Sequence, residues 1–229
     1  SAYEQDRVGF LDFKIYHYGY MNSQVDNKQK FNRNVTLLLQ ELKEEQSHAW
    51  THYYLAAEYY RSKDFRKAFK HVNQSIRLFL NEGIIPPPSM LYRLKYSILL
   101  ETGSWEGAWP AIQSAVRMYP DYVDLNFYMG VILYYKQKYQ EALDCFKVCI
   151  QLGEDNLKYL SIKGSGSFRA WYYIGLCLVK LNSQEEAFLA YQQAITISNN
   201  FVPAREAIAE LISMQPKLGD CIKNPNPEL

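Results

Sequence analysis

Apolar residues recur at helical spacing along most of the chain, in four blocks that resemble one another. Each block has an alanine early in a helical pattern: Ala68, Ala108, Ala142 and Ala187. Twelve residues before each alanine lies a second position, which is small in three blocks: Ala56, Tyr96, Gly130 and Gly175. Two helices joined by a tight turn can cross closely only where small residues face each other. The pattern therefore predicts four helix pairs.

The helices of these pairs are expected near residues 49–61 and 65–80, 89–102 and 105–118, 123–136 and 139–152, and 168–181 and 184–197. Pro110 falls inside one of them and Tyr96 is large where the other blocks are small, so we expect the second pair to be distorted. A helix near 202–214 is expected to cap the last pair. Another helix, near 28–46, places Val35, Leu38, Leu39 and Leu42 on one stripe and is expected to pack on the first pair.

This arrangement resembles the tetratricopeptide repeat, whose period is about 34 residues. The four alanines lie 40, 34 and 45 residues apart, so two of the intervals require insertions. The fold class predicted is all-α, a tetratricopeptide-repeat superhelix (an α-α solenoid) with a short strand-like remnant before it. The expected divisions are 1–26 for that remnant; 27–48 for a linking helix; 49–201 for four repeats (49–82, 89–122, 123–156 and 168–201); 202–216 for the cap; and 217–229 for a tail.

Composition narrows the classes of partner. The chain has 25 Lys and Arg against 24 Asp and Glu, so we expect neither nucleic acid nor an anionic membrane as a partner. No apolar run approaches the ~18 residues that a membrane span needs. The four cysteines form no C-x-x-C pair, which favours reduced thiols over a zinc site and predicts a cytoplasmic protein.

Few residues suggest catalysis. His17, within "FKIYHYGYMN", could ligate a metal or act as an acid or base, or could form a local hydrogen bond beside a glycine turn. His48 and His52 lie four apart on a helix but have no third ligand nearby in the sequence, so a structural role is favoured. "KGSGS" (163–167) lacks the ending of a phosphate-binding loop and is interpreted as a flexible insertion or a loop docked on a neighbour. No catalytic residue and no metal or cofactor are expected within this chain.

In such solenoids the first helix of each pair lines a concave face. The residues expected to line this groove are Trp50, Tyr53, Tyr60, Arg93, Phe127, Tyr134, Arg169 and Tyr172. Their rings and guanidinium groups could hold an extended peptide or a sugar by stacking. The alternative is that these rings pack against each other or against a neighbouring domain.

A second resemblance concerns the order of motifs. "KIYHYGY", then "KQKFNRNVTLLLQEL", and later "SIKGSGSFRAWYYIG" ahead of the fourth repeat are similar to sequences of bacterial family 2 glycosyltransferases with a C-terminal repeat region. The resemblance implies a longer parent protein that uses a nucleotide sugar and a divalent metal (Mg²⁺ or Mn²⁺). Residues 1–26 would be the remnant of the end of its upstream catalytic domain, with His17 near the metal-bound diphosphate. The Asp-x-Asp motif of such enzymes does not occur in this chain.

The function expected is a helical-repeat protein-interaction module, the non-catalytic C-terminal part of a glycosyltransferase that aids acceptor binding or oligomerisation. Its partners would be a protein or peptide acceptor, the upstream catalytic domain and, in a homodimer, a second copy. The alternative is a free-standing tetratricopeptide adaptor that binds peptides. A third hypothesis, an enzyme using His17 and His48, is the least favoured.

Overall fold

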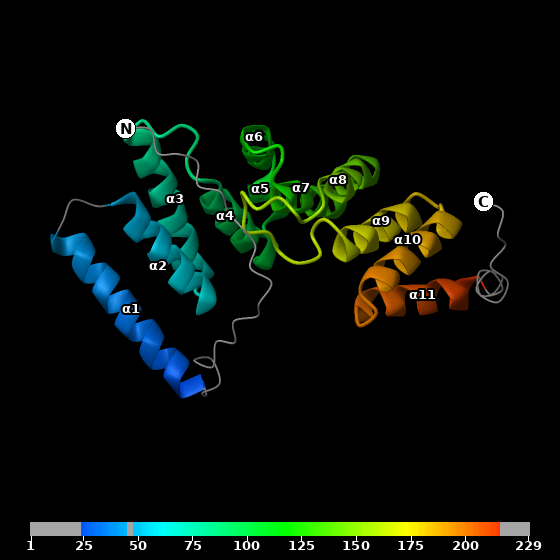
Figure 1. Cartoon of the computed structure of the whole chain (residues 1–229), viewed down its shortest axis with the longest axis horizontal. Coiled ribbons are helices and arrows are strands. Elements are labelled where there is room, and N and C mark those ends of the chain that lie inside the picture. Colours follow the sequence, from blue (N-terminus) through cyan, green and yellow to red (C-terminus); the bar gives the residue numbers. More distant parts are fainter. Residues whose placement is uncertain (1–23, 45–47, 216–229) are drawn as a thin grey trace.

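The computed structural model describes residues 24–44 and 48–215, and within these ranges it contains eleven α-helices and no strand. Their bounds are α1 Gln24–Glu44, α2 Ala49–Arg61, α3 Phe65–Asn81, α4 Ser89–Glu101, α5 Trp105–Ala108, α6 Ala111–Met118, α7 Val123–Tyr135, α8 Tyr139–Leu152, α9 Phe168–Lys180, α10 Gln184–Ile197 and α11 Val202–Met214. Figure 1 shows them following one another along the long axis, from α1 to α11. The prediction of an all-α stack of helix pairs is confirmed. Residues 1–23 of the predicted strand-like remnant lie outside the described residues, as does the tail, whereas residues 24–26 belong to α1.

Glycines allow the two helices of the third and fourth pairs to approach closely. A Cβ atom on Gly130 of α7 would lie 2.8 Å from the ring of Phe146 on α8. A Cβ atom on Gly175 of α9 would lie 2.3 Å from the ring of Tyr191 on α10. Both distances are too short for any real side chain, so the ring of the second helix occupies the space that the glycine leaves. The glycines thus allow the close approach that the pattern predicted, but what faces each of them is an aromatic ring and not a second small residue.

One turn geometry joins the two helices of every pair. The second residue after the first helix has a positive φ in all four cases: Lys63, Gly103, Gln137 and Asn182, with φ of 63°, 64°, 60° and 63°. In the third pair, Gln137 N donates to Tyr134 O at 2.9 Å and Lys138 N donates to Leu133 O at 2.9 Å. This pattern is a helix C-terminal cap with a left-handed residue. The same local geometry sets the same sharp reversal four times.

The second pair is distorted, as Pro110 predicted. The stretch 105–118, expected as one helix, is instead α5 and α6, interrupted at Trp109 and Pro110. Trp109 has an extended backbone (φ −96°, ψ 140°), which is the conformation favoured before proline. Proline also lacks the N–H that a continuous helix would use. The helix prediction for 105–118 was therefore wrong in its continuity.

Helix α1 packs on the first pair through an apolar stripe. The partly buried members of this stripe are Phe31, Val35, Leu38 and Leu42. Two polar contacts support the docking: Asn34 Nδ2 donates to Glu58 Oε1 at 2.8 Å, and Thr51 Oγ1 donates to Glu41 Oε1 at 2.8 Å. Leu39, predicted to belong to the stripe, is 39% exposed, and Phe31 takes part instead.

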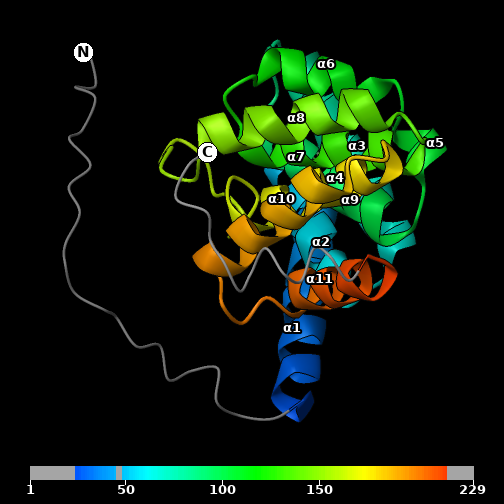
Figure 2. The ribbon, with the colours of Figure 1, turned by 90° about the vertical axis from the view of Figure 1, so that its right-hand side faces the viewer.

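Helix α7 is the centre of the stack. Ten of its thirteen residues are buried, because α4, α6, α8 and α9 all pack against it. A helix enclosed on several sides needs no polar face, which explains why the sequence of α7 is mostly apolar on every side, apart from Asp124 and Asn126 in its first turn. In Figures 1 and 2, α6 and α8 lie towards one edge of the molecule and α11 towards the opposite edge.

Candidate functional site

The first helix of each pair (α2, α4, α7 and α9, called the first helices) carries the eight residues predicted to line a groove. The structure divides these residues among four environments. Trp50 and Tyr53 form an aromatic cluster, and Arg93 forms an ion pair. Tyr60, Phe127 and Arg169 line one pocket. Tyr134 and Tyr172 line another.

The aromatic cluster on α2 packs within the first pair. The ring centroid of Trp50 lies 5.0 Å from that of Phe79 on α3 and 5.9 Å from that of Tyr53, both edge to face. Such pairs favour this geometry because the positive edge of one ring meets the negative face of the other. Trp50 still leaves 41% of its surface exposed. These rings pack against one another and remain partly exposed, on the first of the four first helices.

Arg93 contacts a buried carboxylate. Its Nε lies 3.1 Å from Oδ2 of Asp124, whose side chain is fully buried in the first turn of α7. The backbone N of Ile162 also donates to both carboxylate oxygens of Asp124, at 3.0 Å each. Burial raises the pKa of the Asp124 carboxyl, although these donors act in the opposite direction. The Arg93 guanidinium thus stabilises the packing of α4 on α7, which favours a structural role over ligand binding.

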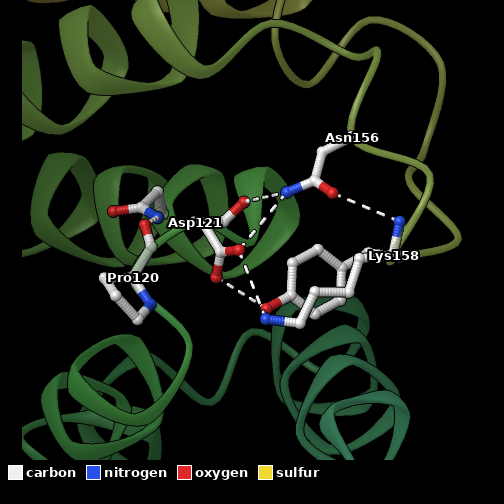
Figure 3. Close-up of polar contacts among 6 residues, drawn as sticks. Pro120, Asp121, Asn156 and Lys158 are labelled. Carbon is white, nitrogen blue, oxygen red and sulfur yellow. Dashed lines mark hydrogen bonds and ion pairs between the residues drawn. The ribbon is translucent and has the colours of Figure 1, made fainter. Parts of the chain in front are cut away.

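The segment 153–167, between α8 and α9, is docked on the start of α7. Asp121 accepts from Tyr159 Oη at 2.6 Å, and from Lys158 Nζ and Asn156 Nδ2 at 3.4 Å each (Figure 3). The ring of Tyr159 stacks on that of Tyr122 at 4.2 Å with an interplanar angle of 5°. Of the two interpretations of this insertion, the docked loop holds.

The "KGSGS" portion of this segment is held by one carboxylate. Oε1 of Glu154 accepts from Gly164 N at 2.6 Å, from Gly166 N at 3.2 Å and from Ser167 Oγ at 2.8 Å. A Cβ on Gly166 would lie 2.2 Å from the carbonyl oxygen of Gly153, so only glycine fits there. The glycines serve a tight internal loop and not a phosphate. The loop also brings Ile162 to the edge of a pocket.

The first pocket, called the central pocket, has a volume of about 390 Å³. Its lining comprises Tyr60, Ser97, Leu100, Glu101, Trp105, Phe127, Tyr128, Val131, Tyr135, Ile162, Arg169 and Tyr173. All four first helices contribute to it. Trp105 and Tyr135 stack at 4.0 Å on one wall, and Ser97 Oγ and Tyr128 Oη lie 2.7 Å apart within it. Arg169 is exposed, and within the described ranges its guanidinium forms no ion pair.

The second pocket, called the end pocket, has a volume of about 300 Å³. Its lining comprises Tyr134, Tyr172, Leu176, Val179, Lys180, Tyr191, Pro203, Glu206, Ala207, Glu210, Leu211 and Met214. It lies between α7, α9, α10 and the last helix, α11. Tyr173 links the two pockets, because its ring lies 6.1 Å from that of Tyr134 and 5.6 Å from that of Tyr172.

Several lining residues were not predicted from the sequence. Trp105, Tyr135 and Tyr173 belong to the central pocket, and Glu206 and Glu210 belong to the end pocket. Tyr173 directly follows the predicted Tyr172, so an aromatic doublet was the available signal. The sequence predicted α11 only as a capping helix, and no local pattern indicated that its glutamates line a pocket.

His52, on α2, contacts a histidine of the neighbouring helix α3. His52 Nδ1 lies 2.8 Å from Nδ1 of His71 on α3. His71 also stacks on the ring of Tyr59 at 5.5 Å. Among the described residues no group of three potential ligands could hold a metal ion. His17 lies outside the described residues.

The His52–His71 contact predicts a pH-dependent stability. Burial, then the charges of His52, Lys70 and Lys67, lowers the pKa of His71 to about 4. Because the unfolded chain binds the proton more readily, stability is full above pH ~6.5 and is lost as the pH falls towards 4. For a half-exposed group we expect a loss of about 1–2 kcal/mol. Urea unfolding of wild type and His71→Gln at pH 7 and pH 5 gives the free energy of unfolding of each. The advantage of wild type over His71→Gln should shrink or reverse at pH 5. An equal loss of stability in both proteins between pH 7 and pH 5 would contradict the prediction.

Comparison with known proteins supports the repeat fold. Residues 97–156 match the family model described as tetratricopeptide repeat. The structure of YrrB, described as a tetratricopeptide-repeat protein with an unusual peptide-binding site, matches with a TM-score of 0.61 and 18% identity, covering 80% of this chain and 86% of that one. No curated protein sequence matches the chain.

Two structures of MamA are similar as well. One matches with a TM-score of 0.60 and 15% identity over 86% of this chain and 99% of that one. The other, residues 41 to the end of the protein from Desulfovibrio magneticus RS-1, matches with a TM-score of 0.60 and 11% identity over 78% of this chain and 94% of that one. At these identities the likeness concerns the fold. Within the described ranges no helix is long and apolar enough to cross a membrane. Residues 97–156 thus match the tetratricopeptide repeat, and the chain has the fold of a tetratricopeptide-repeat solenoid.

Proposed function

We propose that the protein is an interaction module that binds an extended peptide segment of a partner protein along its first helices. The observation that carries the proposal is the central pocket, to which all four first helices contribute. A segment laid across these helices would contact every repeat at once. The similar fold of YrrB, which is described as having a peptide-binding site, is in keeping with this use of the fold.

The chemistry of the central pocket favours a segment with an apolar or aromatic residue next to an acidic one. The stacked rings of Trp105 and Tyr135 offer apolar surface with a polar edge, which suits a peptide side chain. Arg169 stands exposed at the same pocket and can form a forked pair with a carboxylate. An acidic residue of a partner's peptide could contact Arg169 without displacing an ion pair, since Arg169 forms none with the described residues.

A selection experiment tests this function. A phage-displayed library of random peptides would be panned on the folded protein, and the affinity of synthetic versions would be measured by fluorescence anisotropy. Arg169→Ala should weaken binding of the selected peptides about tenfold, since a hydrogen bond to a charged group contributes about 1.5 kcal/mol or more. Arg77→Ala, an exposed arginine on α3 that lines neither pocket, serves as the matched control and should leave affinity unchanged. Selected peptides that bind wild type and Arg169→Ala equally would refute the central pocket as the site.

The finer proposal is that this module serves a glycosyltransferase, aiding acceptor binding or oligomerisation beside an upstream catalytic domain in the cytoplasm. Its support is the similarity of "KIYHYGY", "KQKFNRNVTLLLQEL" and "SIKGSGSFRAWYYIG" to that group. Neither the family model nor the YrrB and MamA structures adds to it. The gene decides the matter: a preceding α/β domain with an Asp-x-Asp motif supports this parent, and a gene that encodes the repeats alone leaves the free-standing peptide-binding adaptor.

A further inference from the structure

The end pocket has an excess of acidic residues, whereas the central pocket is lined by one of each sign, Arg169 and Glu101. Glu206 and Glu210 lie four residues apart on α11, so both project from the same face of that helix and both line the pocket. Both are exposed, and in the described part of the chain neither carboxylate forms an ion pair. Lys180 is the only basic residue among the lining residues. The pocket therefore carries an excess of one negative charge.

Tyrosine rings from three other helices also line the end pocket. Tyr134 of α7, Tyr172 of α9 and Tyr191 of α10 all contribute to it. Burial raises the pKa of Tyr172, and the charges of Glu206 and Glu210 raise it further, so the field of both carboxylates reaches this ring. Aromatic faces attract cations, and they do so more strongly beside carboxylates. Leu176 and Met214 add apolar surface at the same place.

We propose that the end pocket binds the side chain of an arginine or lysine residue. The cationic head would lie between the tyrosine rings and the two carboxylates, and its methylene stem would lie against Leu176 and Met214. A carboxylate or phosphate would be repelled there, whereas Arg169 attracts one at the central pocket. This inference deepens the proposed function and rests on it in one respect: the cation would belong to the same bound segment, whose central residues occupy the central pocket.

A capped amino acid tests the pocket without a peptide. Nα-acetyl-arginine amide would be titrated into ¹³C-methyl-methionine-labelled protein, and the Met214 methyl signal followed by NMR. We expect saturable shifts with a Kd of about 1–10 mM, as befits a ligand of this size. Nα-acetyl-citrulline amide, which has nearly the same shape but no charge, should bind at least fivefold more weakly. Equal binding of the two, or no saturable shift by 50 mM of the arginine probe, would overturn the assignment.

Variants with opposite expected effects on affinity distinguish recognition of the positive charge from structural damage to the pocket. Glu206→Gln/Glu210→Gln should weaken binding of the arginine probe at least fivefold, because both carboxylates are lost. Lys180→Gln should tighten it at least twofold, because the competing ammonium is removed. Glu185→Gln/Glu186→Gln, in the first turn of α10 and outside the pocket lining, should change nothing. Loss of binding in both pocket variants would indicate structural damage and count against the proposal.

The two proposals can fail separately. Should the arginine probe bind while the library yields no peptide that depends on Arg169, the cation pocket stands and the peptide-binding function falls. If selected peptides depend on Arg169 but the arginine and citrulline probes bind alike, only the cation pocket falls. If the peptides depend on Arg169 and carry a basic residue whose replacement by glutamine weakens binding to wild type but not to Glu206→Gln/Glu210→Gln, one segment occupies both pockets.

Discussion

Replacing Asp124 with alanine is expected to lower the free energy of unfolding by about 3 kcal/mol. The carboxylate is fully buried, and its loss leaves the Arg93 guanidinium and the Ile162 N–H without their acceptor. Removing one partner of a buried ion pair typically costs about 3–5 kcal/mol. Because Arg93 keeps about a third of its side-chain surface exposed, water can partly replace the carboxylate, and we expect the lower end of that range. Urea unfolding followed by circular dichroism measures the change.

The same substitution should release the segment 153–167. Lys158 and Lys163 lie in it and are exposed, so trypsin would cut the segment faster once Ile162 is no longer anchored. Asp121→Ala is the matched control: it also removes a carboxylate that contacts this segment, but an exposed one, and should cost under about 1 kcal/mol. Asp124→Asn should fall between the two, since an amide oxygen can still accept from Ile162 N. A loss of under about 1 kcal/mol in Asp124→Ala, with trypsin cleavage of the segment as slow as in wild type, would show that the buried pair does not anchor it.

The helices and their pairing could be predicted because their signals are local. Small residues such as Gly175 and Ala187 recur at fixed separation, and apolar residues recur around them at helical spacing. Each such feature depends on residues within one turn or one helix pair. Pro110 likewise signalled the interruption of 105–118 through its own missing N–H.

The docked segment could not be predicted in the same way. Its anchors join residues 38 positions apart, such as Tyr159 to Asp121 and Ile162 to Asp124. No periodic pattern connects an acidic residue at the start of one helix with a backbone N–H in a distant loop. The sequence therefore left two interpretations open, and only the tertiary contacts decided between them.

The sequence could show which helix face the candidate site residues occupy, but not which residues each of them contacts. Helical spacing placed Tyr60, Phe127 and Arg169 on the first helices, and these three do line one pocket. It could not show that Arg93 contacts a buried carboxylate, because that depends on how α4 and α7 pack. Nor could it show that α11 closes a second pocket. As binding residues, the eight groove positions stay predictions.

Replacing Gly175 with valine is expected to destabilise the protein by about 3 kcal/mol. Even a single Cβ would lie 2.3 Å from the ring of Tyr191, and valine adds two methyl groups beside it. Tyr191, on α10, is 1% exposed and its ring lies against Gly175 of α9, so the ring has little room to move. Overpacking of this kind costs about 1–3 kcal/mol, occasionally more, and the small gain in helix propensity over glycine does not offset it. Urea unfolding measures the loss, and hydrogen exchange of α9 and α10 localises it.

Two further variants decide whether the close approach is the cause. Gly107→Val in α5, where the nearest atom to a new Cβ is 3.9 Å away, should change stability by under about 0.5 kcal/mol. Tyr191→Ala alone should cost about 3 kcal/mol or more as a large-to-small core change. Combined with Gly175→Val, it should cost less than the two single changes added together, by at least about 1 kcal/mol, because the valine then fills space that the ring has left. Strict additivity would mean that Gly175 is required for some reason other than its contact with Tyr191.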